Sequence, residues 1–304
     1  MTAVTAAELN TRENALEGVP IRGADLGNDL MNSRVIVSGL AGLVLLAIGL
    51  AVNNWGVAAG LHVLKPGAVS GNLGVAAAWA VNAGLVIVFM GLIGYAIVGR
   101  PAGILIDVRN RVSLSRLQAA GWSVLMLSAL VTMGAARLIL GKGDALSIAI
   151  PNDLLIAMGI SATSLAVSPA LLSLKATNPP PPNADPNGVA VNTGRQPAAA
   201  EPVGNRMGWA TPKDAHWIDI FSGEGQDDAD KVDLSKVQQF LVTLLLLTVY
   251  AVAIWKLFNG SDYLIPEAAK GAKTAASLPL MSEPLVWFMG ISHIGYLGAK
   301  ALPK

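Results

Sequence analysis

The sequence contains no cysteine, and this absence excludes several kinds of site at once. Without thiols the chain has no disulfide bond, no thiolate metal ligand, no iron–sulfur cluster and no covalently attached haem. Charged residues are also scarce, at 13% of 304 residues, against about 25% in typical soluble domains. The net charge is only +1 and no basic stripe is present, so no nucleic-acid partner is expected.

Catalytic motifs are missing as well. The chain has no P-loop, no G-x-S-x-G and no H-E-x-x-H, which are the usual signatures of phosphate, serine-hydrolase and zinc-protease sites. Its three histidines, His62, His216 and His293, fall in three separate segments. We therefore expect no enzyme, no cofactor and no metal.

Apolar residues make up 53% of the chain and gather in six long runs. A hydrocarbon core of about 30 Å takes roughly 20 helical residues to cross, and each run approaches or exceeds that length. The sequence therefore predicts an all-α membrane protein with six transmembrane helices, arranged as three hairpins. The runs are Val35–Asn53, Val75–Val98, Leu117–Leu140, Leu154–Lys175, Phe240–Phe258 and Leu285–Leu302.

Changes in composition divide the chain into five segments. Residues 1–33 are polar and predict a cytosolic tail, and residues 34–99 predict a first transmembrane hairpin. Residues 100–175 and 213–304 each predict a cytosolic strip followed by a hairpin. Between them, residues 176–212 are rich in Pro, Asn, Ala and Gly without periodicity, which is typical of a disordered linker.

Lys and Arg predict the orientation, because they collect in short cytoplasmic loops. Arg100, Arg109, Arg111 and Arg116 lie between the second and third runs, and the chain ends with Lys300 and Lys304. Both termini are therefore expected in the cytoplasm. The tryptophans support this orientation, because their amphipathic rings favour the membrane–water interface. Five of them fall at predicted ends of spans: Trp55, Trp79, Trp255 and Trp287 at outer ends and Trp122 at an inner end.

One string occurs twice in the sequence. "RVSLSRLQ" (111–118) is matched by "KVDLSKVQ" (231–238), and "MGIS" (158–161) recurs at 289–292. Upstream of the first string, "ILIDV" (104–108) resembles "WIDIF" (217–221), which lies upstream of the second string. Each segment contains one Asp, Asp107 and Asp219. The second and third hairpins are therefore predicted to be a parallel tandem repeat, as occurs in some transporters.

Each copy of the string predicts a helix start. Ser115 with Gln118, and Ser235 with Gln238, have the spacing of a capping box, in which serine and glutamine satisfy two unpaired backbone amides. Arg116 and Lys236 follow the serines in the first turn, where the helix dipole disfavours cations. We expect anionic lipid headgroups to compensate for this cost.

The strings "LSRLQ", "DLSKVQ" and "MGISHIGYLGAK" resemble those of a group of uncharacterised bacterial multi-pass membrane proteins. The resemblance covers roughly residues 100–304. It implies a bacterial inner (plasma) membrane and no particular activity.

Polar side chains inside the predicted spans form the candidate site. None of the spans carries an acid or base near its middle except His293. This composition argues against a proton-coupled pump or voltage sensor, which need ionisable groups inside the membrane. These polar groups either line a ligand site or join neighbouring helices, which glycines such as Gly159 and Gly290 would bring close together. The set is Ser161, Thr163, Ser164, Ser292, His293 and Tyr296.

Acidic residues crowd at positions 224–233, as Glu224, Asp227, Asp228, Asp230 and Asp233. The spacing of a calcium loop and its closing Glu are missing. The segment is interpreted as a solvated acidic turn, with a metal site as the alternative.

Three functions remain open at this point. The first is a non-catalytic membrane scaffold or accessory subunit that self-associates as a homo-oligomer or docks to a larger membrane complex. The second is a channel or passive transporter with a pathway between the repeat hairpins. The third is a cofactor-binding or enzyme subunit that uses His293.

Overall fold

The computed structural model describes residues 22–61, 73–139, 146–177, 207–225, 228–260 and 276–301, and in them the fold is helical. Short 3-10 helices precede two of the long helices: η1 (Pro101–Leu105) before α4, and η2 (Pro212–Asp214) with η3 (Trp217–Ile220) before α6. Strand β1 (Ile148–Ala149) precedes α5, and strand β2 (Ala276–Ser277) precedes α7. The long helices are α2 (Arg22–Leu61), α3 (Leu73–Val98), α4 (Leu114–Ile139), α5 (Asn152–Thr177), α6 (Leu234–Asn259) and α7 (Glu283–Ala301).

Five of these helices are long and apolar enough to cross a membrane, which confirms the helical, membrane-compatible fold class. The five candidate spans are Ser33–Gly56, Gly74–Val98, Leu114–Ile139, Asn152–Leu174 and Leu234–Asn259. The sixth predicted span corresponds to α7, which has only 19 residues and is not among the five. Its Glu283, His293 and Lys300 lower its hydropathy.

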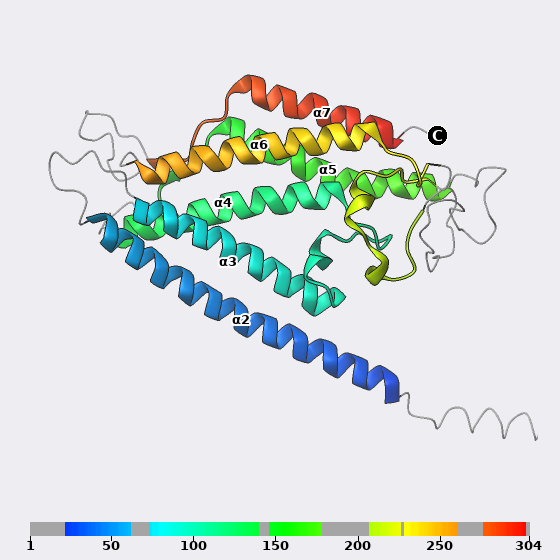
Figure 1. The fold of residues 1–304 in the computed structure, drawn as a ribbon, viewed down its shortest axis with the longest axis horizontal. Helices are drawn as coiled ribbons and strands as arrows, with labels where there is room; N and C mark the ends of the chain where they lie inside the picture. Colours follow the sequence, from blue (N-terminus) through cyan, green and yellow to red (C-terminus); the bar gives the residue numbers. More distant parts are fainter. Residues whose placement is uncertain are drawn as a thin grey trace, which may run out of the picture.

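Four helices form a bundle in which each helix packs against two others. Helix α4 contacts α5 and α6, and α7 contacts the same two helices from the opposite side. Helix α3 then packs on α4 and α6, and α2 packs on α3 and α4. Figure 1 shows all six helices running roughly along the long axis, with α2 outermost on one side and α7 on the other.

The two ends of the bundle differ. At one end, β1 and β2 pair in parallel, with Ile148 opposite Ala276 and Ala149 opposite Ser277. At the other end, residues 99–113, 207–225 and 228–233, here called the loop module, fold over the helices. Helix α2 begins and α7 ends at the same end as the loop module (Figure 1).

The loop module contains two strips that fold back in the same manner. In each strip the residue before the helix donates its amide to a carbonyl upstream, and a second bond closes the turn between them. The bonds are Ser113 N to Leu105 O (2.8 Å) and Asp107 N to Arg111 O (2.9 Å) in one strip, and Asp233 N to Phe221 O (2.8 Å) and Gly223 N to Lys231 O (3.1 Å) in the other. By these bonds Asp107 in the first strip corresponds to Gly223 in the second, and not to Asp219 as the sequence match predicted.

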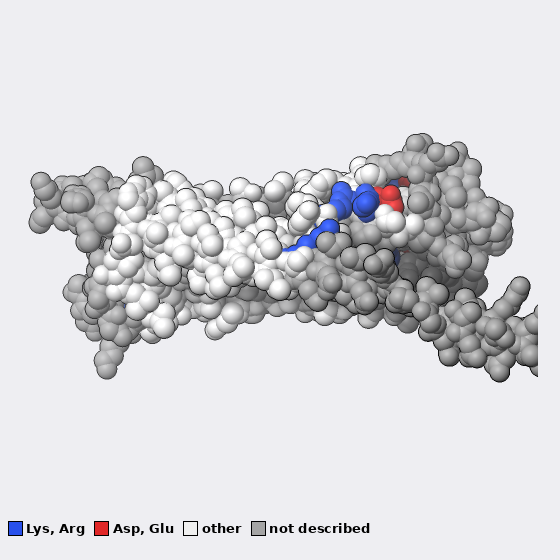
Figure 2. All heavy atoms as spheres, turned by 90° about the horizontal axis from the view of Figure 1, so that it is seen from below, with Lys and Arg blue, Asp and Glu red and all other residues white. Residues whose placement is uncertain are grey.

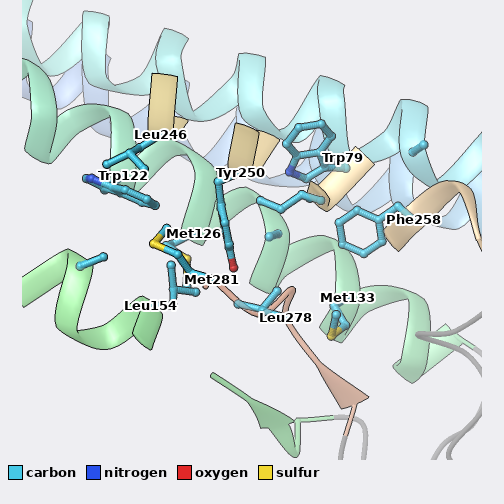
Figure 3. Close-up of a cluster of buried hydrophobic side chains, with 14 of the residues drawn as sticks. Trp79, Trp122, Met126, Met133, Leu154, Leu246, Tyr250, Phe258, Leu278 and Met281 are labelled. Carbon is cyan, nitrogen blue, oxygen red and sulfur yellow. The ribbon is translucent and has the colours of Figure 1, made fainter. Parts of the chain in front are cut away.

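The apolar core lies between α3, α4, α5 and α6 toward the β1–β2 end (Figure 3). Trp122 packs against Tyr250 at a ring-centroid distance of 5.8 Å, and Trp79 packs edge-on against Trp255 at 6.4 Å. Trp79 and Trp122 are buried, so the prediction that they anchor at the membrane interface is wrong. Both indole rings pack within the apolar core instead.

Helix α2 attaches to the bundle through small and polar residues. A Cβ added at Gly56 would lie 2.7 Å from the backbone carbonyl oxygen of Gly74, so a glycine is needed for this approach of α2 and α3. Further along, Asn82 donates to Asn53 Oδ1 (3.2 Å) and to Thr132 Oγ1 (2.7 Å). These contacts link α2, α3 and α4 in one hydrogen-bonded set.

Two predicted boundaries differ from the structure. Helix α2 begins at Arg22, inside the segment assigned to the tail, and residues 1–21 lie outside the described part. The predicted linker lies mainly outside it as well, at 178–206. Its last residues do not belong to a linker, because Met207 and Trp209 are buried in the loop module.

Candidate functional site

A single carboxylate, Glu224, stands at the centre of the loop module. Its Oε1 lies 2.9 Å from Lys300 Nζ, 3.1 Å from Lys236 Nζ and 3.5 Å from Arg109 Nη2. All four side chains are at most 5% exposed. Glu224 therefore joins the first strip to the start of α6 and the end of α7.

The two strips are also joined to each other by arginines. Arg109 forms a two-bond pair with Asp107 Oδ2, through Nε at 2.9 Å and Nη2 at 2.8 Å. Arg111 donates to the Gly223 carbonyl at 2.7 Å and to the Ser222 hydroxyl. Figure 2 shows charged atoms gathered on the half of the molecule that carries this module, while the rest of the described face is uncharged.

Burial and neighbouring cations act in opposite directions on the acids of this cluster. Burial raises the pKa of Glu224, but the charges of Lys236, Arg109 and Lys300 outweigh it, so the pKa lies well below its ordinary value. Burial likewise opposes the ionisation of Asp107, and the charge and hydrogen bonds of Arg109 lower its pKa overall. Both acids are therefore ionised at neutral pH.

Two sequence predictions for this region are wrong. Glu224 is not part of a solvated acidic turn, because it is 3% exposed and held by three cations. Lys236 does not reach lipid headgroups, because its amine is buried and also donates to the Ser222 carbonyl at 2.7 Å. Arg116, in contrast, is half-buried at the start of α4, and its lipid role stays a prediction.

The helix-cap assignments also change. The N-cap of α6 is Asp233, whose Oδ1 accepts from the Ser235 amide at 3.0 Å and from the Ser235 hydroxyl at 2.5 Å. Gln238 is exposed. In the other copy, Ser115 is already the second residue of α4 and its hydroxyl bonds side chains of other helices.

Ten polar side chains from four helices form what we call the interior polar cluster, in the half of the bundle next to the loop module. Each is at most 6% exposed. They are Ser115 and Gln118 of α4, Ser161, Ser164 and Ser168 of α5, Gln239 and Thr243 of α6, and Ser292, His293 and Tyr296 of α7.

One part of the interior polar cluster joins α4, α5 and α7. The Ser115 hydroxyl lies 3.0 Å from Ser168 Oγ and 3.3 Å from Tyr296 Oη. Lys300 donates to the same Tyr296 oxygen at 3.2 Å. Because Lys300 also pairs with Glu224, the interior of the bundle is connected to the charged groups of the loop module.

A second part joins α6 with α7 and with α4. Gln239 accepts from the Ser292 hydroxyl at 2.5 Å, and its amide nitrogen lies 2.9 Å from His293 Nδ1. Gln118 donates to Thr243 Oγ1 at 2.6 Å. The predicted Ser292 and His293 thus meet a glutamine from the neighbouring helix.

The three predicted α5 residues do not behave alike. Thr163 is exposed on the outer face of α5 and donates to the Gly159 carbonyl of its own helix at 2.8 Å. Ser161 and Ser164 are buried, and their hydroxyl oxygens have no hydrogen-bond partner among the described residues. Thr163 therefore does not belong to the cluster that Ser161 and Ser164 help to form.

Sequence reasoning missed the buried role of Glu224, which pairs with three cations, and missed Gln239, which bonds Ser292 and His293. Glu224 was hidden among acids that are solvated in most proteins, and its partners lie far away in the sequence. For Gln239 a signal existed, because two glutamines stand side by side in "KVQQF". A shift of one residue turns a helical side chain by about 100°, so only one of the two faces the bundle.

The hydrogen bonds of the interior polar cluster connect α4, α5, α6 and α7 to one another. Among the described residues, no group of three or more His, Asp or Glu side chains comes together as a metal site. Comparison of the chain with protein-family models, with curated proteins and with solved structures finds no match.

Proposed function

We propose that this chain is a non-catalytic integral membrane scaffold or accessory subunit that self-associates or docks to a larger membrane complex. One observation carries the proposal: most hydrogen-bonding groups of the interior polar cluster are spent on one another across α4, α5, α6 and α7. Groups used in this way fix the helices relative to each other and are not available to handle a substrate.

The proposed topology has six spans in a bacterial inner membrane, with α7 as the sixth span. Both termini lie on the cytoplasmic side. The position of α7 supports this, because it packs along α5 and α6 on the bundle. The α4–α5 and α6–α7 hairpins form the parallel repeat of the proposal. The parallel pairing of β1 with β2 and the matching bonds of the two strips support it.

Single cysteines test the topology, because the native chain contains none. Val232 and Leu280 are 75% and 81% exposed at opposite ends of the bundle, and Ala301 is the exposed last residue of α7. An impermeant thiol reagent on intact cells is expected to label Leu280→Cys and to spare Val232→Cys and Ala301→Cys. Labelling of Ala301→Cys together with Leu280→Cys would show that α7 does not cross.

The outer face of α5 and α7 is the proposed association surface. A groove of about 660 Å³ runs between the two helices, lined by Gly159 and Gly290 among mainly apolar side chains, with Asp153, Thr163, Glu283 and His293 also in the lining. A Cβ added at Gly159 would meet nothing within 4 Å, so this glycine is not needed for packing within the chain. Exposed glycines of this kind let helices of a second chain approach closely.

The Gly159→Leu substitution tests this surface, with Gly84→Leu as its matched control. Gly84 of α3 also has nothing within 4 Å of an added Cβ. Particles extracted from native membranes in nanodiscs are expected to exceed the 31.3 kDa of one chain for the native protein and Gly84→Leu, but not for Gly159→Leu. Equal masses for the two variants would exclude this face as the interface.

A channel or passive transporter is the second candidate, and one observation favours it. Ser161 Oγ, Ser164 Oγ and Gln118 Oε1 are buried without a partner among the described residues. A buried polar atom left unsatisfied costs about 1–3 kcal/mol, so three such atoms support a solute pathway there. Their access to water distinguishes the two candidates.

A further inference from the structure

A second hollow borders the interior polar cluster, whose Ser115 and Ser168 form part of its lining. It has a volume of about 460 Å³ and lies between α4 and α5 beneath the first strip of the loop module. Arg116, Ala119 and Ser123 line it from α4, and Leu165 and Pro169 line it from α5. The hollow is therefore reached from the side of the bundle at the start of the α4 span.

The charged groups of this hollow are paired, except one. Asp107 is bound by Arg109, and Lys300 is bound by Glu224. Arg116 forms no ion pair with any described carboxylate, and its one hydrogen bond is a long one to the Ile104 carbonyl, at 3.4 Å. The hollow thus offers one uncompensated guanidinium, which suits a bidentate phosphate contact.

Polarity changes along the length of the hollow. Arg116 and Ser113 lie at the level where the α4 span begins, whereas Met90, Ala119 and Leu165 line the deeper part. From Arg116 to Ser123 the helix advances seven residues, or about 10 Å toward the membrane centre. The hollow therefore has a cationic entrance at headgroup depth and an apolar interior at acyl-chain depth.

We propose that this hollow binds one anionic phospholipid, with its phosphate on Arg116 and part of an acyl chain between α4 and α5. The site requires only the chain itself and a bilayer, so it stands or falls independently of the scaffold function. A free phosphate ion would use Arg116 alone and would leave the apolar part empty.

The test measures lipid retained by the purified full chain after reconstitution in vesicles of equal parts phosphatidylglycerol and phosphatidylcholine. Native mass spectrometry is expected to find one phosphatidylglycerol on the native protein. Arg116→Gln is expected to weaken its retention about fivefold or more, the effect of one basic residue near an anionic surface. Arg34→Gln is the matched control and is expected to retain the lipid, since Arg34 is an exposed arginine that lies over the Tyr95 ring, near Gly99 of the loop module.

A second variant keeps the charge and fills the hollow. Ala119→Phe leaves Arg116 in place and is expected to exclude the lipid from the hollow. Thermal unfolding of the native protein and of this variant in detergent checks that the fold persists. Retention by Arg116→Gln equal to that of the native protein would overturn the proposal. So would equal retention of phosphatidylcholine, or displacement of the lipid by millimolar inorganic phosphate.

Discussion

Glu224 shows how much one buried residue determines in this protein. A carboxylate is costly to remove from water unless cations and hydrogen bonds replace its hydration. Here three cations do so, two of them on the helices α6 and α7. Because Lys236 and Lys300 belong to the bundle, their ion pairs with Glu224 also fix the loop module to the bundle.

Replacing Glu224 by Gln is expected to lower the free energy of unfolding by about 3–5 kcal/mol, because buried Lys236 and Lys300 then lose their countercharge. Thermal unfolding in detergent measures the change. Glu283→Gln is the control, since Glu283 is an exposed carboxylate whose bond from Trp287 Nε1 is 3.3 Å long. A Tm unchanged in Glu224→Gln would show that the cluster contributes nothing to the fold.

The lowered pKa values of Glu224 and Asp107 predict a pH dependence of stability. A carboxylate whose pKa is depressed in the folded state contributes fully above its unfolded value, about 4, and loses this contribution as the pH falls below it. We expect the Tm to stay flat from pH 7 to about 5 and to decline below that. The decline is expected to be shallower in Glu224→Gln, and parallel curves would contradict the assignment.

Single residues could be found from the sequence where their surroundings are local or repeated. Ser292, His293 and Tyr296 were found because polar groups inside an apolar run are unusual, and the structure places all three in the interior polar cluster. Glu224 could not be found, because its burial depends on Arg109 and Lys300, which lie far from it in the sequence. Neither charge pattern nor hydropathy contains that information.

At the scale of elements, helix starts are set by the residue that accepts the first free amides. Asp233 does this for α6, although the string pattern favoured Ser235. We expect Asp233→Ala to cost about 1 kcal/mol of stability and Ser235→Ala clearly less, as measured by thermal unfolding. The reverse ranking would restore the serine as the cap.

Helix positions were predictable, but helix faces were not. The six apolar runs correspond to α2–α7 because length and hydropathy are properties of a local segment. The face that a helix turns inward depends on its neighbours, which is why Gln239 rather than Gln238 enters the bundle. For the same reason Trp79 and Trp122 became core residues instead of interface anchors.

At the scale of the whole molecule, the bundle has two unlike halves. Aromatic and aliphatic side chains fill the half toward β1 and β2 (Figure 3), and the interior polar cluster fills the half toward the loop module. Asn82 and Thr132 are buried in the apolar half and bonded to each other, and we expect the packed apolar groups around them to leave no path for ions. We therefore expect the bundle to be closed to water and, in the proposed scaffold function, to act by binding other chains.

Access of water to the interior tests this claim most directly. Ser164→Cys and Ser292→Cys place single thiols at interior positions that are at most 4% exposed, with Leu280→Cys as the exposed control. In proteoliposomes, a small charged methanethiosulfonate reagent is expected to modify Leu280→Cys and to leave both interior thiols unmodified from either side. Rapid modification of the interior thiols would contradict the scaffold and support a water-filled pathway through the bundle.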